Sequence, residues 1–218
     1  MSDDPETLRQ IQALARDTRP LLVVDVDEVV LEFVSPFAGF LASRGHDLGQ
    51  DVFRLHGNIF RSGTREALAD EEVSVLIDEF WGVQADWQQL ALGAESALAN
   101  LSREAEVVLL TAMPHRFGEH RRRHLQAIGL PYPLLTTERD KGPAVAMLRG
   151  ADARPVAFVD DILRNHLSVR DAVPDAGLFH IMAHAGMRAQ LPALPADVVA
   201  MEDWRQGEPL IARALGIG

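Results

Sequence analysis

Acidic residues stand directly after two short apolar runs of the chain. Asp25 and Asp27 follow the run LLVV, and Asp160 and Asp161 follow the run VAFV. Residues two apart on an extended chain point to the same side, so Asp25 and Asp27 should lie together. Neighbouring carboxylates repel each other unless a cation or a shared proton intervenes. The pattern indicates that a cation or a shared proton stabilises these acids; the alternative is that Asp25 and Asp27 are loop residues that cap the following helix.

A hydroxyl and an ammonium group complete this set. Thr111 ends the apolar run VVLL, where its hydroxyl could donate to a phosphoryl oxygen or, alternatively, cap a helix. Lys141 stands at the expected start of a short helix. Its ammonium could neutralise part of the acidic charge and steady a phosphate, whereas the alternative is a solvated surface lysine.

The elements that must position these residues alternate along the chain. Apolar runs predict strands at 21–24, 107–110, 133–137, 156–159 and 177–182. Helical segments lie between them, and a first helix is predicted to begin with Asp4 as N-cap and Pro5, and to end by Pro20. This alternation predicts an α/β fold with a doubly wound parallel sheet, covered on both faces.

The long segment between the first two strands has a different character. From Phe33 to Gln89 the pattern is helical, and no alternating strand pattern interrupts it. We therefore expect a helical cap at 33–89, inserted into a Rossmann-like core formed by residues 1–32 and 90–218. Such a cap would lie over the carboxyl ends of the strands, where open α/β sheets bind ligands.

The order and spacing of these residues resemble the four signature motifs of the haloacid dehalogenase superfamily. The resemblance extends over about residues 21–182, including the insertion point of the cap. It rests on Asp25, Asp27, Thr111, Lys141 and the Asp160–Asp161 pair. It implies that Asp25 is the nucleophile and Asp27 the general acid and base, with Thr111 and Lys141 as further catalytic residues.

The same resemblance implies a magnesium site. Mg²⁺ would be held by Asp25, the backbone carbonyl of Asp27, and Asp160. Asp161 would be either a water-mediated ligand or a partner of the lysine. The dehalogenases of this superfamily lack an aspartate at the position of Asp27, so its presence favours a phosphatase.

Two positions depart from the superfamily pattern. Glu28 stands where many members have glycine, which adds negative charge and stiffens the turn. Ala112 stands where asparagine is frequent. We nevertheless expect Ala112 to contact the substrate, together with Thr111, Lys141 and Arg61.

Other side chains of the expected cap and core have competing interpretations. Arg61 or Arg65 could reach a second anionic group on the substrate, or belong to a solvated helix end. Phe80, Trp81 and Trp87 are interpreted as packing between cap helices.

His120 and His124 are four residues apart on a predicted helix, which is a spacing that can bind metal. Three arginines lie between them, so we predict an exposed basic face instead.

These observations favour a Mg²⁺-dependent phosphohydrolase that cleaves a small phosphate monoester through an aspartyl-phosphate. A phosphotransferase with the same nucleophile and a non-catalytic phosphate-binding protein remain as alternatives. The net charge of −11 argues against nucleic-acid polymers and anionic membranes as partners. The chain has no cysteine and no apparent signal peptide, so we expect a cytoplasmic location. The oligomeric state is left open.

Overall fold

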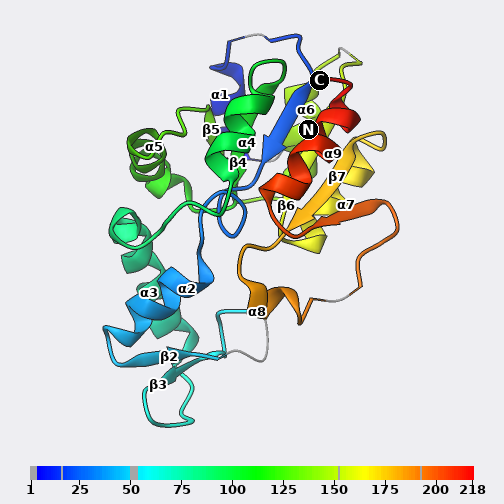
Figure 1. The fold of residues 1–218 in the computed structure, drawn as a ribbon. Coiled ribbons are helices and arrows are strands. Elements are labelled where there is room, and N and C mark those ends of the chain that lie inside the picture. The colour runs from blue at the N-terminus through cyan, green and yellow to red at the C-terminus, as the bar shows by residue number, and fades with distance from the viewer. Residues whose placement is uncertain (1–3, 16, 50–53, 152, 192) are drawn as a thin grey trace.

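A six-stranded parallel sheet forms the centre of the structure, a computed structural model that describes residues 4–15, 17–49, 54–151, 153–191 and 193–218. The strand order is β5-β4-β1-β6-β7-β8, and all five pairings are parallel (Figure 1). The strands are β1 (Leu21–Val24), β4 (Glu106–Thr111), β5 (Leu134–Thr136), β6 (Val156–Asp160), β7 (Gly177–Ile181) and β8 (Val198–Met201).

Helices cover both faces of this sheet because side chains alternate along each strand. Leu22 and Val24 of β1 belong to an apolar cluster shared with α4, α5 and α9, whereas Leu21 and Val23 belong to one shared with α1, α6 and α7. The helices are α1 (Pro5–Gln12), α4 (Ala94–Leu101), α5 (Gly118–Ala127), α6 (Lys141–Arg149), α7 (Leu163–Ala172) and α9 (Trp204–Leu215). The predicted doubly wound parallel sheet is confirmed.

One strand of this sheet has no counterpart among the predicted elements. The five predicted strands correspond to β1, β4, β5, β6 and β7. The sixth strand, β8, is four residues long with two exposed residues at its centre, so it lacks a continuous apolar run.

No helix in the described part of the chain is long and apolar enough to cross a membrane.

The first helix begins as predicted but ends earlier, at Gln12. Asp4 is the N-cap, and its Oδ1 accepts a hydrogen bond of 3.1 Å from the backbone N–H of Thr7. Its other oxygen accepts from the backbone N–H of Glu138 at 2.9 Å, and His115 Nε2 lies 3.0 Å from Oδ1. Burial alone would raise the pKa of Asp4, but the bonds from Glu138 and Thr7 lower it to about 2.

We expect Asp4→Asn to lose about 1–2 kcal/mol of stability at pH 7, because a neutral amide makes weaker bonds to these donors. A carboxylate whose pKa is lowered on folding stabilises the protein above its unfolded pKa, and this contribution is lost as pH falls through the folded pKa. The difference from wild type should therefore shrink between pH 4 and pH 2. Urea unfolding checks this, with the exposed ion-pair variant Asp175→Asn as control. An unchanged difference at low pH would rule out charge as the cause.

The inserted segment between β1 and β4 forms the cap. It contains α2 (Val34–Ala42) and α3 (Asp70–Val83), and the 3₁₀ turn η1 (Gln84–Asp86) follows α3. Between the two helices lies an antiparallel pair of strands, β2 (His46–Leu48) and β3 (Ile59–Arg61). The expectation that no strand interrupts this segment is wrong. Each strand has three residues, which is too short for an alternating pattern to appear in the sequence.

Aromatic side chains fill the interior of the cap, as predicted. The ring of Phe80 packs edge-on against Phe37, with ring centroids 5.1 Å apart, and Trp87 packs edge-on against Phe40 at 5.8 Å. Edge-to-face packing at this range is favourable for aromatic pairs. Met113 and Met182 of the core join the same apolar cluster, so the cap packs directly on the core.

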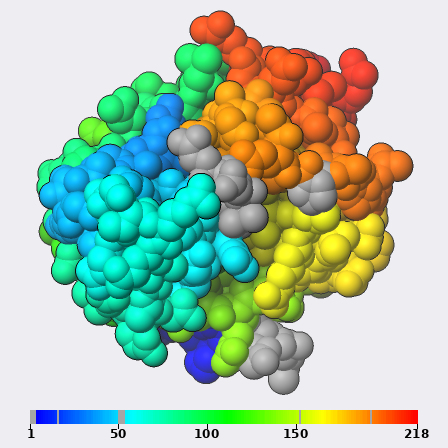
Figure 2. Space-filling model, turned by 90° about the horizontal axis from the view of Figure 1, so that it is seen from below, coloured from blue at the N-terminus to red at the C-terminus, as the bar shows by residue number. Residues whose placement is uncertain are grey.

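The chain enters and leaves the cap at one point. Leu31 and Leu90 form an antiparallel bridge, and the backbone N–H of Glu32 donates to the carbonyl of Gln89 at 2.8 Å. The boundaries that we propose, at residues 33 and 89, lie next to this bridge. Seen from below, the cap in cyan and blue lies beside the yellow and orange segments of the core (Figure 2).

Candidate active site

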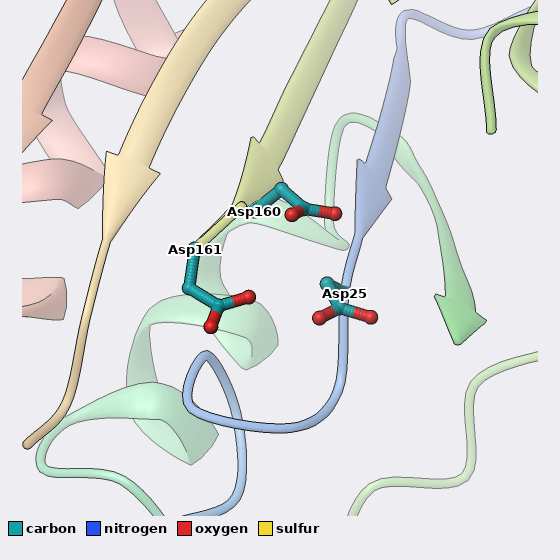
Figure 3. A group of neighbouring side chains, drawn as sticks. All are labelled: Asp25, Asp160 and Asp161. Atoms are coloured by element: carbon teal, nitrogen blue, oxygen red, sulfur yellow. The ribbon is translucent and has the colours of Figure 1, made fainter. Parts of the chain in front are cut away.

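Parallel register brings two of the candidate acids together. Val24 of β1 is paired with Val159 of β6, and the backbone N–H of Asp25 donates to the carbonyl of Val159 at 2.9 Å. Asp25 and Asp160, the next residue on each chain segment, therefore lie side by side at the ends of β1 and β6. Together with Asp161 they form a buried group in which one carboxylate oxygen of each residue lies within 4.8 Å of the others (Figure 3).

Lys141 joins this group from the first turn of α6. Its side chain is buried, and Nζ lies 2.6 Å from Asp25 Oδ1 and 2.7 Å from Asp160 Oδ2. The alternative of a solvated surface lysine is therefore wrong. The lysine contacts Asp25 and Asp160, whereas the resemblance had given Asp161 as its possible partner.

The carboxylate of Asp160 is fixed on both oxygens. The backbone N–H of Ile162 donates to Oδ1 at 2.8 Å. The amide of Asn165 donates to Oδ1 at 2.9 Å and to Oδ2 at 3.1 Å. Asn165 is not among the predicted site residues, although its place one helical turn after the acidic pair could have indicated it.

The charges of this group are poorly balanced. Burial raises the pKa of Asp25 to about 7; the charges of Asp160 and Asp27 add to the rise, and Lys141 opposes it. Burial also raises the pKa of Asp161, and the charges of Asp160 and Asp25 add to that rise. Burial would lower the pKa of Lys141, but Asp160 and Asp25 raise it above its usual value.

The donor set fits a divalent cation. With all groups ionised, three carboxylates and one ammonium leave two negative charges in a buried space. Carboxylate oxygens are the protein ligands that Mg²⁺ prefers. Asp25, Asp160 and Asp161 are therefore the residues that could hold a magnesium ion.

We expect the metal-free protein to lose stability as pH rises from about 4 to about 7. An acid whose pKa is raised on folding favours the folded state at low pH, and this contribution is lost as pH passes the folded pKa of Asp25, about 7. Because a divalent cation would replace the missing proton, Mg²⁺ should raise the melting temperature more at pH 8 than at pH 5. Thermal melts with and without EDTA measure this. An equal Mg²⁺ effect at both pH values would contradict it.

Asp27 lies beside this group with a separate set of partners. Its Oδ1 accepts from Gln88 Nε2 at 2.8 Å and from Arg121 Nη2 at 3.0 Å. Within the part of the chain that the structure describes, its Oδ2 has only a long contact, at 3.5 Å, with the hydroxyl of Thr111. The side chain remains 20% exposed, so Asp27 is the accessible acid of the site.

The predicted basic face of α5 is wrong for two of its residues. Arg121 and His124 are buried, whereas His120 is exposed. Arg121 Nε donates to the side-chain oxygen of Gln84 in the cap. Positions 121, 124 and 125 share one helical face, and Leu125 on that face could have indicated that its neighbours are buried.

Glu28 has a backbone conformation that glycine adopts without strain. Its φ is +61°, and its side chain is buried. One carboxylate oxygen accepts from the backbone N–H of Phe33 at 2.8 Å and of Val34 at 2.6 Å, and the other accepts from the N–H of His184 at 2.8 Å. These three hydrogen bonds offset the free-energy cost of the positive φ of Glu28. They also hold the Glu28 carboxylate against backbone N–H groups at the start of α2 and of α8 (Ala185–Arg188).

The remaining predicted site residues lie at different depths. Thr111 is buried at the end of β4, and Ala112 beyond it is exposed. Arg61 lies on β3 in the cap and forms an ion pair with Glu72 at 3.0 Å. The structure thus brings Asp25 and Lys141 together with Asp160 and Asp161. It places Arg61 in an ion pair within the cap instead of in this group.

Several solved structures with a similar fold are described as phosphatases or haloacid dehalogenase-like hydrolases. A Clostridium difficile protein assigned as a phosphatase has a TM-score of 0.60 at 12% identity, covering 90% of this chain and 100% of its own. A haloacid dehalogenase-like hydrolase from Xanthomonas campestris has a TM-score of 0.57 at 13% identity, covering 92% and 98%. The chain has the haloacid dehalogenase fold.

A magnesium-bound structure has the same fold. It is a protein assigned as a haloacid dehalogenase hydrolase, YfnB from Bacillus subtilis, with a TM-score of 0.57 at 13% identity, covering 89% of this chain and 99% of its own. No protein family profile matches the chain, and no curated protein sequence matches it. In this chain, Asp25 at the end of β1 and the Asp160–Asp161 pair at the end of β6 lie at the carboxyl edge of the sheet.

Proposed function

We propose that this protein is a Mg²⁺-dependent phosphohydrolase that acts on a small phosphate monoester. The observation that carries the proposal is the buried contact of Lys141 with both Asp25 and Asp160 at the carboxyl edge of the sheet. Phosphoryl transfer depends mainly on positioning and on neutralising negative charge. A buried carboxylate with an ammonium 2.6 Å away provides a nucleophile and a positive charge at one place.

In the proposed reaction Asp25 attacks phosphorus, and the bond from phosphorus to the leaving oxygen breaks. Asp27 gives its proton to that oxygen, which leaves an aspartyl-phosphate on Asp25 and an ionised Asp27. Asp27 then takes a proton from water as the water attacks phosphorus, which releases Asp25 and inorganic phosphate. Lys141 and the hydroxyl of Thr111 stabilise the charge on the phosphoryl oxygens.

The metal site of this proposal uses residues already close together. Asp25, Asp160 and Asp161, with the backbone carbonyl of Asp27, would hold Mg²⁺. When bound, Mg²⁺ neutralises charge between the anionic nucleophile and the anionic phosphate. The magnesium bound to the Bacillus subtilis protein of the same fold supports this choice of metal.

The proposed substrate is a small phosphorylated metabolite that contacts Thr111, Ala112 and Lys141. Arg61 would have to leave its ion pairs with Glu72 and, at 3.5 Å, with Glu66 to reach a second anionic group of the substrate. Because these side chains are about half exposed or more, little free energy opposes the opening of the two pairs.

The test is phosphate release from a panel of sugar phosphates, nucleotides, an alkyl phosphate and p-nitrophenyl phosphate, with Mg²⁺ or EDTA. We expect release that requires the metal. Beryllium fluoride should raise the melting temperature only together with Mg²⁺, because it occupies a working nucleophile site. Binding without release would indicate transfer to an acceptor other than water. Neither release nor binding would leave a non-catalytic phosphate-binding protein.

A further inference from the structure

The side chain of Arg121 is a fully buried cation that contacts a proposed catalytic group. Its exposure is 0%, and Nη2 lies 3.0 Å from Oδ1 of Asp27. A buried guanidinium is costly unless it is paired, and an apolar side chain of similar volume usually stabilises a protein as well or better. The need to pack α5 therefore does not explain an arginine at this position.

The contacts of Asp27 divide its two oxygens into different roles. Among the described residues, Oδ1 accepts two hydrogen bonds, from Arg121 and Gln88, whereas Oδ2 has only the 3.5 Å contact with Thr111. A general acid and base needs a fixed orientation and one oxygen that can exchange a proton with the substrate. Anchoring through Oδ1 leaves Oδ2 for this exchange.

Arg121 is itself fixed by the segment that returns from the cap. Nε donates to Gln84, and the guanidinium lies 5.2 Å from the centre of the Trp81 ring. Gln88, the second donor to Asp27, belongs to the same segment. The orientation of Asp27 therefore depends on residues of the core and on the last residues of the cap.

We propose that Arg121 is a positioning residue that orients Asp27 for proton transfer to the leaving oxygen. This inference rests on the proposed phosphohydrolase function. Because Arg121 contacts Asp27, it would orient both proton transfers of Asp27, and kcat/KM, which covers the steps through departure of the leaving group, isolates the first of them.

The test compares two substrates whose leaving groups differ in their need for a proton. An alkyl phosphate requires an acid, whereas p-nitrophenyl phosphate releases a stable phenolate. We expect Arg121→Met to lower kcat/KM by about 10- to 100-fold on the alkyl phosphate and by less than about threefold on the aryl phosphate. Arg121→Lys keeps the charge but not the planar fork, so it should give the same pattern with a smaller loss.

Two further variants separate positioning from folding. Asp27→Asn should show the same preference for the aryl phosphate, and adding Arg121→Met to it should cause no further loss. Arg154→Met is the matched control, because Arg154 is also buried and paired with an acid, Glu106 at 2.6 Å, at the opposite end of the strands. Any loss in that variant should be equal on both substrates.

Equal losses on both substrates in Arg121→Met, or a further loss in the double variant, would overturn the inference while leaving the proposed function intact. Absence of phosphate release by the wild type on any substrate would overturn the proposed function, and the inference with it.

Discussion

Asp25→Asn is expected to lower the rate of phosphate release by on the order of 10⁴-fold or more. An amide oxygen is a poor nucleophile, so the aspartyl-phosphate cannot form. The substitution removes a carboxyl group whose ionisation is opposed by burial, so the variant should fold with a stability similar to wild type. Phosphate release and acid-quenched labelling of the protein by a radioactive substrate measure both expectations.

The control for this variant is Asp175→Asn. Asp175 is 66% exposed and pairs with Arg149, so the same chemical change there should leave the rate unchanged. Activity of Asp25→Asn equal to that of wild type would exclude Asp25 as the nucleophile. Loss of release with labelling intact would mean that another residue carries the phosphoryl group.

Lys141→Met is expected to lower both activity and stability. Loss of a charge that stabilises the transition state costs about 10²- to 10³-fold in rate. At pH 7 the variant should lose about 3–5 kcal/mol of stability, because breaking a buried ion pair leaves Asp25 and Asp160 without their cation. The loss should be smaller at pH 5, where the raised pKa of Asp25 favours its neutral form.

Urea unfolding of Lys141→Met at pH 5 and pH 7 measures this difference. Arg149→Met is the control, since its ion pair with the exposed Asp175 should contribute little at either pH. Lys141→Arg tests shape, because a planar guanidinium does not fit where a compact ammonium contacts two carboxylates. An equal loss at both pH values would show that the cost comes from packing and not from charge.

The sequence carried a signal for Lys141 that spacing alone did not reveal. Lys141 is the only lysine in the chain, and the other 20 basic residues counted with it are arginines. Arginine makes the surface ion pairs of this protein, such as those to Asp175 and Glu72. A single lysine in such a chain marks the position where a compact charge fits between Asp25 and Asp160.

The strands of the core and the acids that follow them were predictable because each strand is encoded by a short, continuous run of apolar residues. Continuous apolar runs make buried strands, and parallel strands place the residues that follow them at one edge. In-register pairing of β1 with β6 then sets Asp25 beside Asp160 without further information.

The surroundings of Asp27 were not predictable in this way. Arg121 and Gln88 are 94 and 61 residues away from Asp27 along the chain, and they meet it only after the cap returns to the core. Arg121 stands among two other arginines and two histidines, a composition typical of an exposed helix face. Apart from the apolar Leu125 on the same helical face, only tertiary packing distinguishes the buried arginine from its neighbours.

The bridge between Leu31 and Leu90 has a consequence for how such proteins diversify. An insertion whose two ends are already paired can be shortened, lengthened or exchanged without moving β1 or β4. Selection can therefore change the cap, which we propose contacts the substrate, while the acids and the lysine stay in place. Gln84 contacts Arg121, and Gln88 contacts Asp27, so the part of the cap that can be exchanged ends before Gln84. A cap taken from another protein would have to be joined to the segment of this chain that contains Gln84 and Gln88.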